Sequence, residues 1–374
     1  MRIKFFLEEY ISPEESEYST EAIVLAQGLR KLGIQFFSNV PNWRDPIEQA
    51  YLFQPAPEGF EADVNIYFSM SYFLGKPERL ATIDTSKINI ALERNDELVP
   101  YWQRPDYEGF SKFDLILISH YNDNQPYPPY KVKPWQMGYT ERIYNYIEKY
   151  IDEPVEDIVL DTYRLHHNLR QLAVAKLSTG LKEIYPTKQY ITDPLTAKGI
   201  DLNEPDLTYW KLTGKRHNPD YFRELNRSLF TYCFGGFFHP LPATQSFLSK
   251  LLRQYYKVRI KLEERLGKDT SSNYYIYQWD SYRLWEALLA KTCPILLDLE
   301  DWGFQLPVNP VNGKHYIGVH KFNFDDTIAL VKSMSKDQII EIGWEGRKWV
   351  MENYSPPATA KRFLKLVDEV PKKS

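Results

Sequence analysis

The sequence predicts an α/β protein built from two doubly wound, Rossmann-like domains that face each other across a cleft. With 374 residues, the chain is long for one core and suits two domains of about 150–200 residues each. Short apolar segments alternate with segments of helix length, which is typical of parallel βαβ units. The alternation stops near residues 120–150 and then resumes. We therefore expect domains at 1–145 and 146–350, followed by a C-terminal helix at 351–374 that can pack back on the first domain.

The first series begins with an apolar strand at residues 2–7. A helix then runs from Ser19, which can cap its start, to Gly33, which can end it, because apolar residues recur between them at helical spacing. Further strands are expected where apolar runs are bounded by polar or turn-forming residues, at 34–37, 64–68, 88–92 and 113–119.

A run rich in Asn, Pro and Tyr at residues 122–130 indicates an inter-domain connection or an exposed loop. The second series then places strands at 157–163, 229–234, 294–298 and 316–319, and helices at 325–334, 336–354 and 358–370. Ligands of open parallel sheets bind at the C-terminal ends of the strands. We therefore expect the binding site between the two domains.

The amino-acid composition argues against nucleic-acid-binding, membrane-spanning and secreted proteins. The formal net charge is −4 and the basic residues are scattered, which does not favour binding to nucleic acid. No run of about 18 apolar residues and no signal-peptide pattern occurs, so we expect a cytoplasmic protein that can touch a membrane only peripherally. Cys233 and Cys293 lie in apolar runs and are expected to be core residues.

The segment from Gln278 to Asp298 carries the strongest chemical signal. Ser281 can begin a helix whose free N–H groups and positive end attract phosphate, and its hydroxyl can add a donor. One turn further on, Glu286 can accept two ribose hydroxyls. The alternatives are that Ser281 is only a helix cap and that Glu286 is a solvated helix residue.

The same run, Ser281-Tyr-Arg-Leu-Trp-Glu-Ala-Leu followed by Cys293-Pro-Ile, resembles the donor-binding signature of GT-B glycosyltransferases of the exostosin-like and family 1 or 4-like kinds. The resemblance implies transfer of a hexosyl or related sugar from a UDP- or GDP-sugar to an acceptor hydroxyl. The acceptor would be a glycan, a lipid-linked molecule or a small molecule. The resemblance also implies that Glu286 binds the ribose and that Ser281, Tyr282 and Arg283 lie at the donor. Two residues depart from the signature. Gln278 stands in place of a Glu, which leaves retention or inversion open, whereas Lys291-Thr292 in place of a turn Gly is expected to affect only the geometry of the turn.

Other donor contacts are expected around the second sheet. Lys215 and Arg216 can neutralise the diphosphate in place of a metal, and Arg164 can reach it from a strand end. Gly235 and Gly236 can let the backbone approach the ligand, and Asp301 can contact sugar hydroxyls. Each also has a plainer interpretation as a solvated loop or tight turn. With no metal-ligand spacing, the sequence predicts a metal-independent enzyme without a cofactor.

The catalytic base is expected from the first domain, where polar residues follow predicted strands. His120 and Glu9 are the leading candidates, and Glu8, Glu93 and Asp96 occupy similar positions. Two other functions stay open on the same fold. One is a nucleotide-sugar epimerase, and the other is a catalytically inactive protein that binds carbohydrate or nucleotide.

Overall fold

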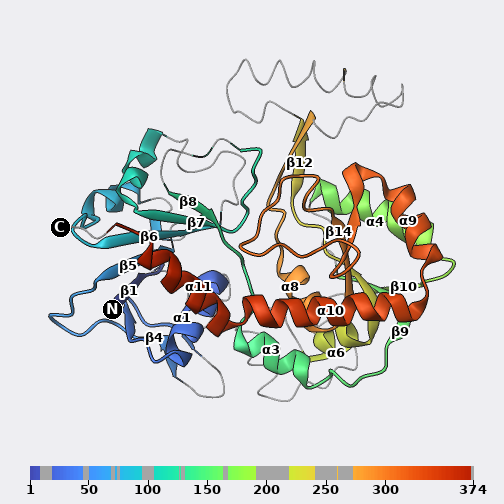
Figure 1. Ribbon diagram of the computed structural model, residues 1–374, viewed down its shortest axis with the longest axis horizontal. Helices are drawn as coiled ribbons and strands as arrows, with labels where there is room; N and C mark the ends of the chain where they lie inside the picture. Colours follow the sequence, from blue (N-terminus) through green and yellow to red (C-terminus); the bar gives the residue numbers. More distant parts are fainter. Residues whose placement is uncertain are drawn as a thin grey trace.

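The computed structural model describes residues 1–8, 19–44, 50–68, 72–73, 76–94, 105–125, 127, 131–162, 167–190, 219–240, 259 and 273–371. These residues form two lobes side by side, each built around one parallel sheet (Figure 1). We call the lobe that contains the N-terminus the first lobe, and the other the second lobe.

The sheet of the first lobe has the strand order β2-β1-β5-β6-β7-β8, and every neighbouring pair is parallel. Its central strands are apolar runs buried between layers, as parallel strands require, whereas the two edge strands are only partly buried. They are β1 (Ile3–Phe6), β2 (Phe36–Ser38), β5 (Val64–Phe68), β6 (Ile88–Glu93), β7 (Leu115–Ile118) and β8 (Val132–Pro134). The other elements are helix α1 (Thr20–Lys31), the hairpin β3 (Asn42–Arg44) and β4 (Tyr51–Phe53), and the 3₁₀ helices η2 (Pro77–Thr82) and η4 (Pro105–Lys112).

The sheet of the second lobe has the order β10-β9-β11-β14-β15, again fully parallel. Its strands are β9 (Glu156–Asp161), β10 (Thr187–Gln189), β11 (Ser228–Tyr232), β14 (Cys293–Leu297) and β15 (Ile317–Val319). The helical elements are α3 (Glu141–Glu148), α4 (Asn168–Leu181), α6 (Pro219–Arg227), α8 (Tyr282–Leu289), η6 (His320–Phe322), α9 (Phe324–Ser333) and α10 (Lys336–Tyr354). An antiparallel ribbon of β12 (Phe237–Pro240) and β13 (Tyr274–Tyr277) leaves this lobe between β11 and α8.

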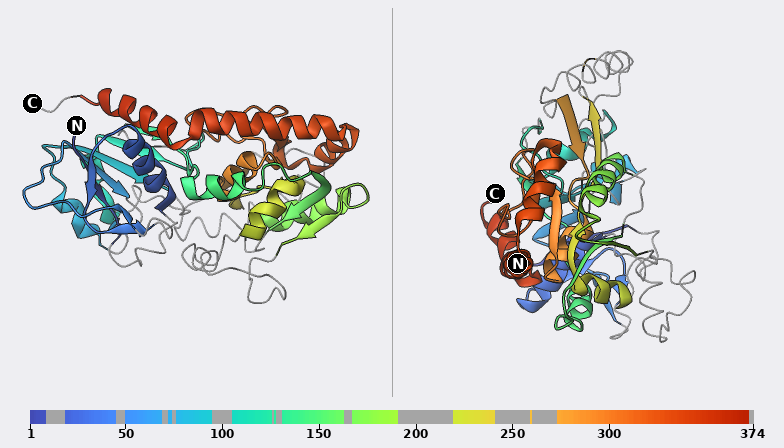
Figure 2. Two further views of the ribbon diagram at one scale, coloured as in Figure 1. Left: turned by 90° about the horizontal axis from the view of Figure 1, so that it is seen from below. Right: turned by 90° about the vertical axis from the view of Figure 1, so that its right-hand side faces the viewer.

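The C-terminal helices join the lobes. Helix α10 packs on α8 and β14, and α11 (Pro356–Asp368) continues across to the first lobe, where Phe363 and Val367 enter its core (Figures 1 and 2). Helix α11 approaches α1 at Gly28, where an added Cβ would lie 1.9 Å from the Pro356 carbonyl oxygen. The end of the chain thus packs on the first lobe.

The structure confirms both parallel series and the buried, free cysteines. It differs from expectation in residues 120–150, which add β8 to the first sheet and form α3. Ser19 makes no side-chain cap, whereas Gly33 does adopt the positive φ (71°) of a helix end. The boundaries at 145 and 350 stay predictions. None of the helices in the described ranges is long and apolar enough to cross a bilayer.

Candidate functional site

Helix α8 begins at the C-terminal edge of the second sheet, with Ser281 in the extended conformation of an N-cap (φ −145°, ψ 149°). The Ser281 hydroxyl caps nothing: it is buried, with 7% of the residue exposed, and has no hydrogen-bond partner among the described residues. Ser335, at the same position of α10, accepts a bond from the Gln338 N–H. A buried hydroxyl without a partner is costly, and such a group calls for an explanation. Ser281 therefore has a hydrogen bond to offer a ligand.

Glu286 and Arg283 project from the same helix and are held by the neighbouring elements. The Tyr221 hydroxyl of α6 donates to Glu286 Oε2 at 2.5 Å. Arg283 donates through Nη2 to the Thr162 carbonyl at 2.8 Å and through Nε to its hydroxyl, just beyond β9. Burial first, and then the Glu286 carboxylate, raise the pKa of Tyr221 well above its usual value, so the phenol stays a donor. The acid and the guanidinium are thereby held in defined positions on α8.

Gly235 and Gly236 follow β11 at the foot of the ribbon. An added Cβ would lie 2.3 Å from the Trp279 carbonyl oxygen at Gly235 and 2.0 Å from that of Tyr277 at Gly236, which also has φ 83°. The close approach that these glycines allow is therefore made by the chain's own residues 277–279. It brings the C-terminal end of β11 directly against the start of α8.

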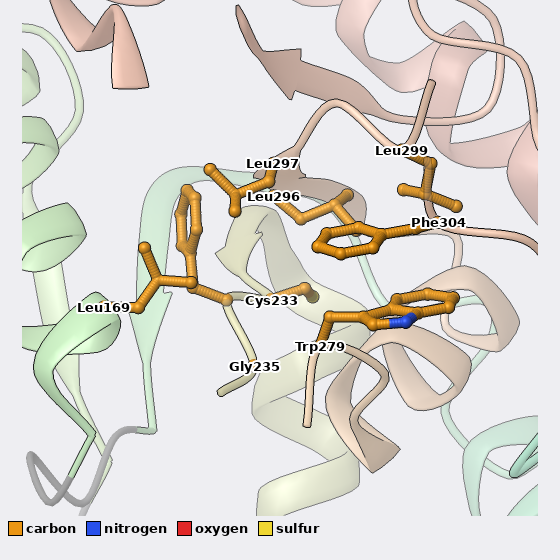
Figure 3. A pocket seen from close by; sticks show the side chains of 9 residues that line it. Leu169, Cys233, Gly235, Trp279, Leu296, Leu297, Leu299 and Phe304 are labelled. Carbon is orange, nitrogen blue, oxygen red and sulfur yellow. The ribbon is translucent and has the colours of Figure 1, made fainter. Parts of the chain in front are cut away.

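A small apolar pocket lies at this junction (Figure 3). It is lined by Leu169, Cys233, Phe234, Gly235, Trp279, Leu296, Leu297, Leu299 and Phe304. The Trp279 and Phe304 rings stack 4.8 Å apart at 7°. Its cavity volume is only about 10 Å³, roughly the space that one water molecule needs. The pocket as it stands is therefore too small for any part of a nucleotide sugar. Burial raises the pKa of the Cys233 thiol, which makes it unreactive.

The loop after β7 connects the first lobe to this junction. His120 Nδ1 accepts the Asp280 N–H at 3.1 Å, and the Tyr121 carbonyl accepts Trp279 Nε1 at 3.2 Å. Asn122 forms an antiparallel bridge with Phe304. The Nδ1 atom of His120 is thus engaged as an acceptor by the backbone before α8, and its role as a base stays a prediction.

Asp280, which sequence reasoning missed, lies at the centre of this contact. Its fully buried carboxyl accepts the Met137 N–H at 3.1 Å and Trp285 Nε1 at 2.8 Å. Burial raises the pKa of Asp280 to about 7, against the lowering effects of His120 and of these two hydrogen bonds. Its position directly before Ser281 was the only sequence signal.

A buried ion pair of the first lobe faces the same helix. Arg94 Nη2 lies 2.6 Å from Glu21 Oε2, and the Ser119 hydroxyl donates to Glu21 Oε1 at 3.2 Å. The Arg94 guanidinium is 5.9 Å from the Tyr282 ring, which brings this first-lobe cation to the start of α8. The pair joins residues 73 positions apart, so local patterns could not reveal it.

Glu8 follows β1 at the C-terminal edge of the first sheet. The residue is 6% exposed, and burial raises the pKa of its carboxyl to about 7, although nearby Lys76 lowers it. A carboxyl that titrates near neutral pH at a strand end has the properties of a general base.

Of the remaining predicted residues, the structure describes some, and the others lie outside the described ranges. Asp301 pairs with His320 (Oδ2–Nδ1 2.5 Å) and Glu93 is buried at the end of β6. Glu9, Asp96, Arg164, Lys215 and Arg216 lie outside the described residues. Within the described ranges no cluster of three His, Cys, Asp or Glu could hold a metal ion, and metal independence stays a prediction.

Comparison with known proteins gives fold similarity only. No protein-family profile matches the chain, and no curated protein matches it in sequence. An α-glucosyltransferase solved with UDP-glucose and DNA containing an abasic site is similar, with a TM-score of 0.55 and 11% identity over 99% of this chain and 100% of the other. A glycosyltransferase from Rickettsia africae has a TM-score of 0.52 and 12% identity over 100% and 99%. These similarities confirm the expected fold class: the chain has the GT-B fold, with two Rossmann-like units.

Proposed function

We propose that the protein is a glycosyltransferase that moves a sugar from a nucleotide-sugar donor to an acceptor hydroxyl without a metal ion. The observation that carries the proposal is the buried Ser281 hydroxyl, which lacks a partner in the described structure although it begins a helix beside Arg283 and Glu286. Phosphate binds well at a helix N-terminus because N–H groups and the helix dipole meet it there. The two solved proteins compared above are glycosyltransferases, one of them solved with UDP-glucose, so we favour a UDP-sugar.

Each residue of α8 then has a role. Ser281 and the first N–H groups of the helix bind the diphosphate, and Arg283 stabilises the charge that forms on it as the glycosidic bond breaks. Glu286, oriented by Tyr221, accepts the ribose hydroxyls. Lys215, Arg216 and Arg164 are proposed to add cations, as expected from the sequence.

For the base we propose Glu8 ahead of His120 and Glu9. Its raised pKa places the deprotonated, proton-accepting form above about pH 7. The value of kcat/KM should therefore rise with pH through about 7 in the native enzyme. Glu8→Gln should lower the rate and remove this rise while leaving the affinity for UDP unchanged. An unaltered pH profile in that variant would exclude Glu8 as the base.

Calorimetric titration with UDP and a panel of UDP- and GDP-sugars tests the function. The native protein should bind one of them, and Glu286→Gln should weaken binding at least about tenfold, since it removes a charged hydrogen-bond acceptor. Glu300→Gln, a change of an exposed acid on the neighbouring loop, is the matched control. Equal affinity in native protein and Glu286→Gln would refute the proposed donor site.

Analysis of the reaction products distinguishes a glycosyltransferase from an epimerase and from an inactive binding protein. A transferase should release UDP from the donor, slowly with water and faster with an acceptor. An epimerase would convert the donor without any acceptor, and an inactive binding protein would do neither.

A further inference from the structure

A loop of the first lobe and a loop of the second lobe pair with each other through their main chains. The Asp123 N–H donates to the Gly303 carbonyl at 2.8 Å, and the Gln305 N–H donates to the Tyr121 carbonyl at 3.1 Å. Bonds of this kind align two segments as in an antiparallel sheet, here between the lobes. We call the whole contact the clasp, and it comprises residues 120–124 of the first lobe and residues 279–280 and 302–305 of the second.

Side chains extend the clasp beyond this main-chain pair. Asn124 Nδ2 donates to the Trp302 carbonyl at 3.0 Å, and the Asn124 N–H donates to Asn122 Oδ1 at 2.8 Å, which fixes the shape of the first-lobe loop. Gly303 leaves room for this approach, because an added Cβ would lie 2.8 Å from Asn124 Nδ2. The two loops are therefore fitted to each other in a defined register.

The clasp continues into the segment that leads to α8. Phe304 is buried and stacks on Trp279, whose Nε1 donates to the Tyr121 carbonyl. The next residue, Asp280, donates its N–H to His120 Nδ1. The clasp thus holds the first lobe against the two residues that precede the candidate donor helix.

First-lobe side chains lie on both sides of the start of α8. His120 binds Asp280, directly before Ser281, and the Arg94 guanidinium lies 5.9 Å from the ring of Tyr282, directly after it. The pocket at the same junction has a cavity volume of only about 10 Å³. The Ser281 hydroxyl, buried between these contacts, becomes accessible to a diphosphate when the first lobe moves away.

The connections between the lobes allow such a movement. Helix α10 packs on the second lobe and α11 on the first, and Ser355 between them is extended (ψ 151°), so the two helices do not form one continuous rod (Figure 2). In the other connection, residues 135–140, Gly138 has φ 74°. Hinges consist of a few residues of this kind at the ends of elements. The lobes can therefore rotate apart while α11 stays on α1.

We propose that the clasp is an autoinhibitory contact, an inference that rests on the proposed function. The free protein has its lobes fastened over the start of α8, and the clasp opens to admit the nucleotide sugar. A ligand that binds only the open form has an apparent affinity reduced by the fraction of protein that is fastened. Locking the clasp should therefore prevent donor binding, and loosening it should improve donor binding.

A disulfide across the clasp provides the lock. Asn122 and Phe304 face each other between the two main-chain bonds. Such non-hydrogen-bonded pairs have Cα atoms about 4.5 Å apart, within the span of a disulfide. We combine Asn122→Cys and Phe304→Cys in the full chain with Cys233→Ala, because the Cys233 thiol lines the same pocket as Phe304. The new thiols should pair on mild oxidation without ligand, as peptide mapping by mass spectrometry would show.

Calorimetry with UDP and GDP then compares the oxidised and reduced forms of this one protein. Oxidation should weaken nucleotide binding at least about tenfold, and dithiothreitol should restore it. Asn124→Ala, which removes the bond to Trp302, should raise the affinity of the otherwise native chain about threefold. Asn353→Ala removes an equivalent bond to the Trp349 carbonyl within α10 and should leave the affinity unchanged.

The two proposals fail in different ways. Equal nucleotide affinity in the oxidised and reduced forms would overturn the autoinhibitory clasp and leave the transferase proposal intact. Thiols that stay unpaired in the free protein would show that the lobes rest apart, and this result would also overturn the clasp. If neither the reduced form nor Asn124→Ala binds any nucleotide, the proposed function is refuted, and the clasp loses its inhibitory role with it.

Discussion

At the residue scale, two serines at the same helix position have opposite roles. The Ser335 hydroxyl accepts the Gln338 N–H in a complete capping box, so its hydrogen bond belongs to the fold. Ser281 is also an N-cap, yet its buried hydroxyl makes no hydrogen bond in the described part of the chain. A polar group that the fold buries without using it is available to a ligand or a water molecule.

Ser281→Ala should therefore change binding and not stability. We expect the free energy of unfolding in urea to change by less than about 0.5 kcal/mol, because no bond within the protein is lost. Donor affinity in calorimetry should fall about tenfold, since the lost bond is to a charged group. Ser335→Ala, the matched control, should cost about 1 kcal/mol of stability and leave affinity unchanged. A loss of stability in Ser281→Ala comparable to that of the control would contradict this role.

At the scale of elements, the contact between α1 and α11 depends on one glycine. Gly28 allows the Pro356 carbonyl to approach so closely that any side chain there would collide with backbone. Gly180 of α4 differs, because its nearest neighbour at 2.3 Å is the Cδ1 atom at the flexible end of Ile328 on α9. Backbone cannot move aside as a side chain can.

Gly28→Ala should thus destabilise the protein by at least about 2 kcal/mol, despite the higher helix propensity of Ala. Gly180→Ala should cost less than about 1 kcal/mol, because rotation of Ile328 and the gain in propensity offset the crowding. Urea titration followed by circular dichroism measures both. Equal losses in the two variants would show that α11 adjusts freely on α1.

At the scale of the whole molecule, Asp280 joins both lobes through one buried carboxyl. Its backbone binds His120 of the first lobe, and its oxygens accept bonds from Met137 and Trp285. Burial keeps the carboxyl protonated up to about pH 7, whereas in the unfolded chain it ionises near 3.8. Between these values the folded state binds the extra proton, so stability must fall as pH rises.

The free energy of unfolding should therefore decrease from about pH 4 to pH 7 and then level off. For Asp280 alone the difference is on the order of 4 kcal/mol. Asp280→Asn should flatten this slope, and what remains should come from Glu8, whose pKa is raised to about 7 in the same direction. Urea titrations at pH 5, 6, 7 and 8 measure the slope. The same slope in native protein and variant would show that Asp280 does not titrate in this range.

Local patterns in the sequence determined the series of strands and helices. Apolar runs of strand length predicted β5, β6, β9 and β14 to within one or two residues, because parallel strands are buried on both faces. Helical periodicity predicted α1 and α10 in the same way. The run around Ser281 also marked the candidate donor helix, since an N-cap serine with an acid one turn inside is a local feature.

Only the tertiary structure decided how the two lobes meet. The contact of His120 with Asp280, the pairing of Arg94 with Glu21 and the packing of α11 on α1 join residues far apart in the chain. It also decided that Gly235 and Gly236 serve the approach of the chain's own backbone. Sequence periodicity indicates which side of a helix or strand is buried, but not which other element covers that side. The identity of the covering element depends on long-range packing, which follows from the whole fold.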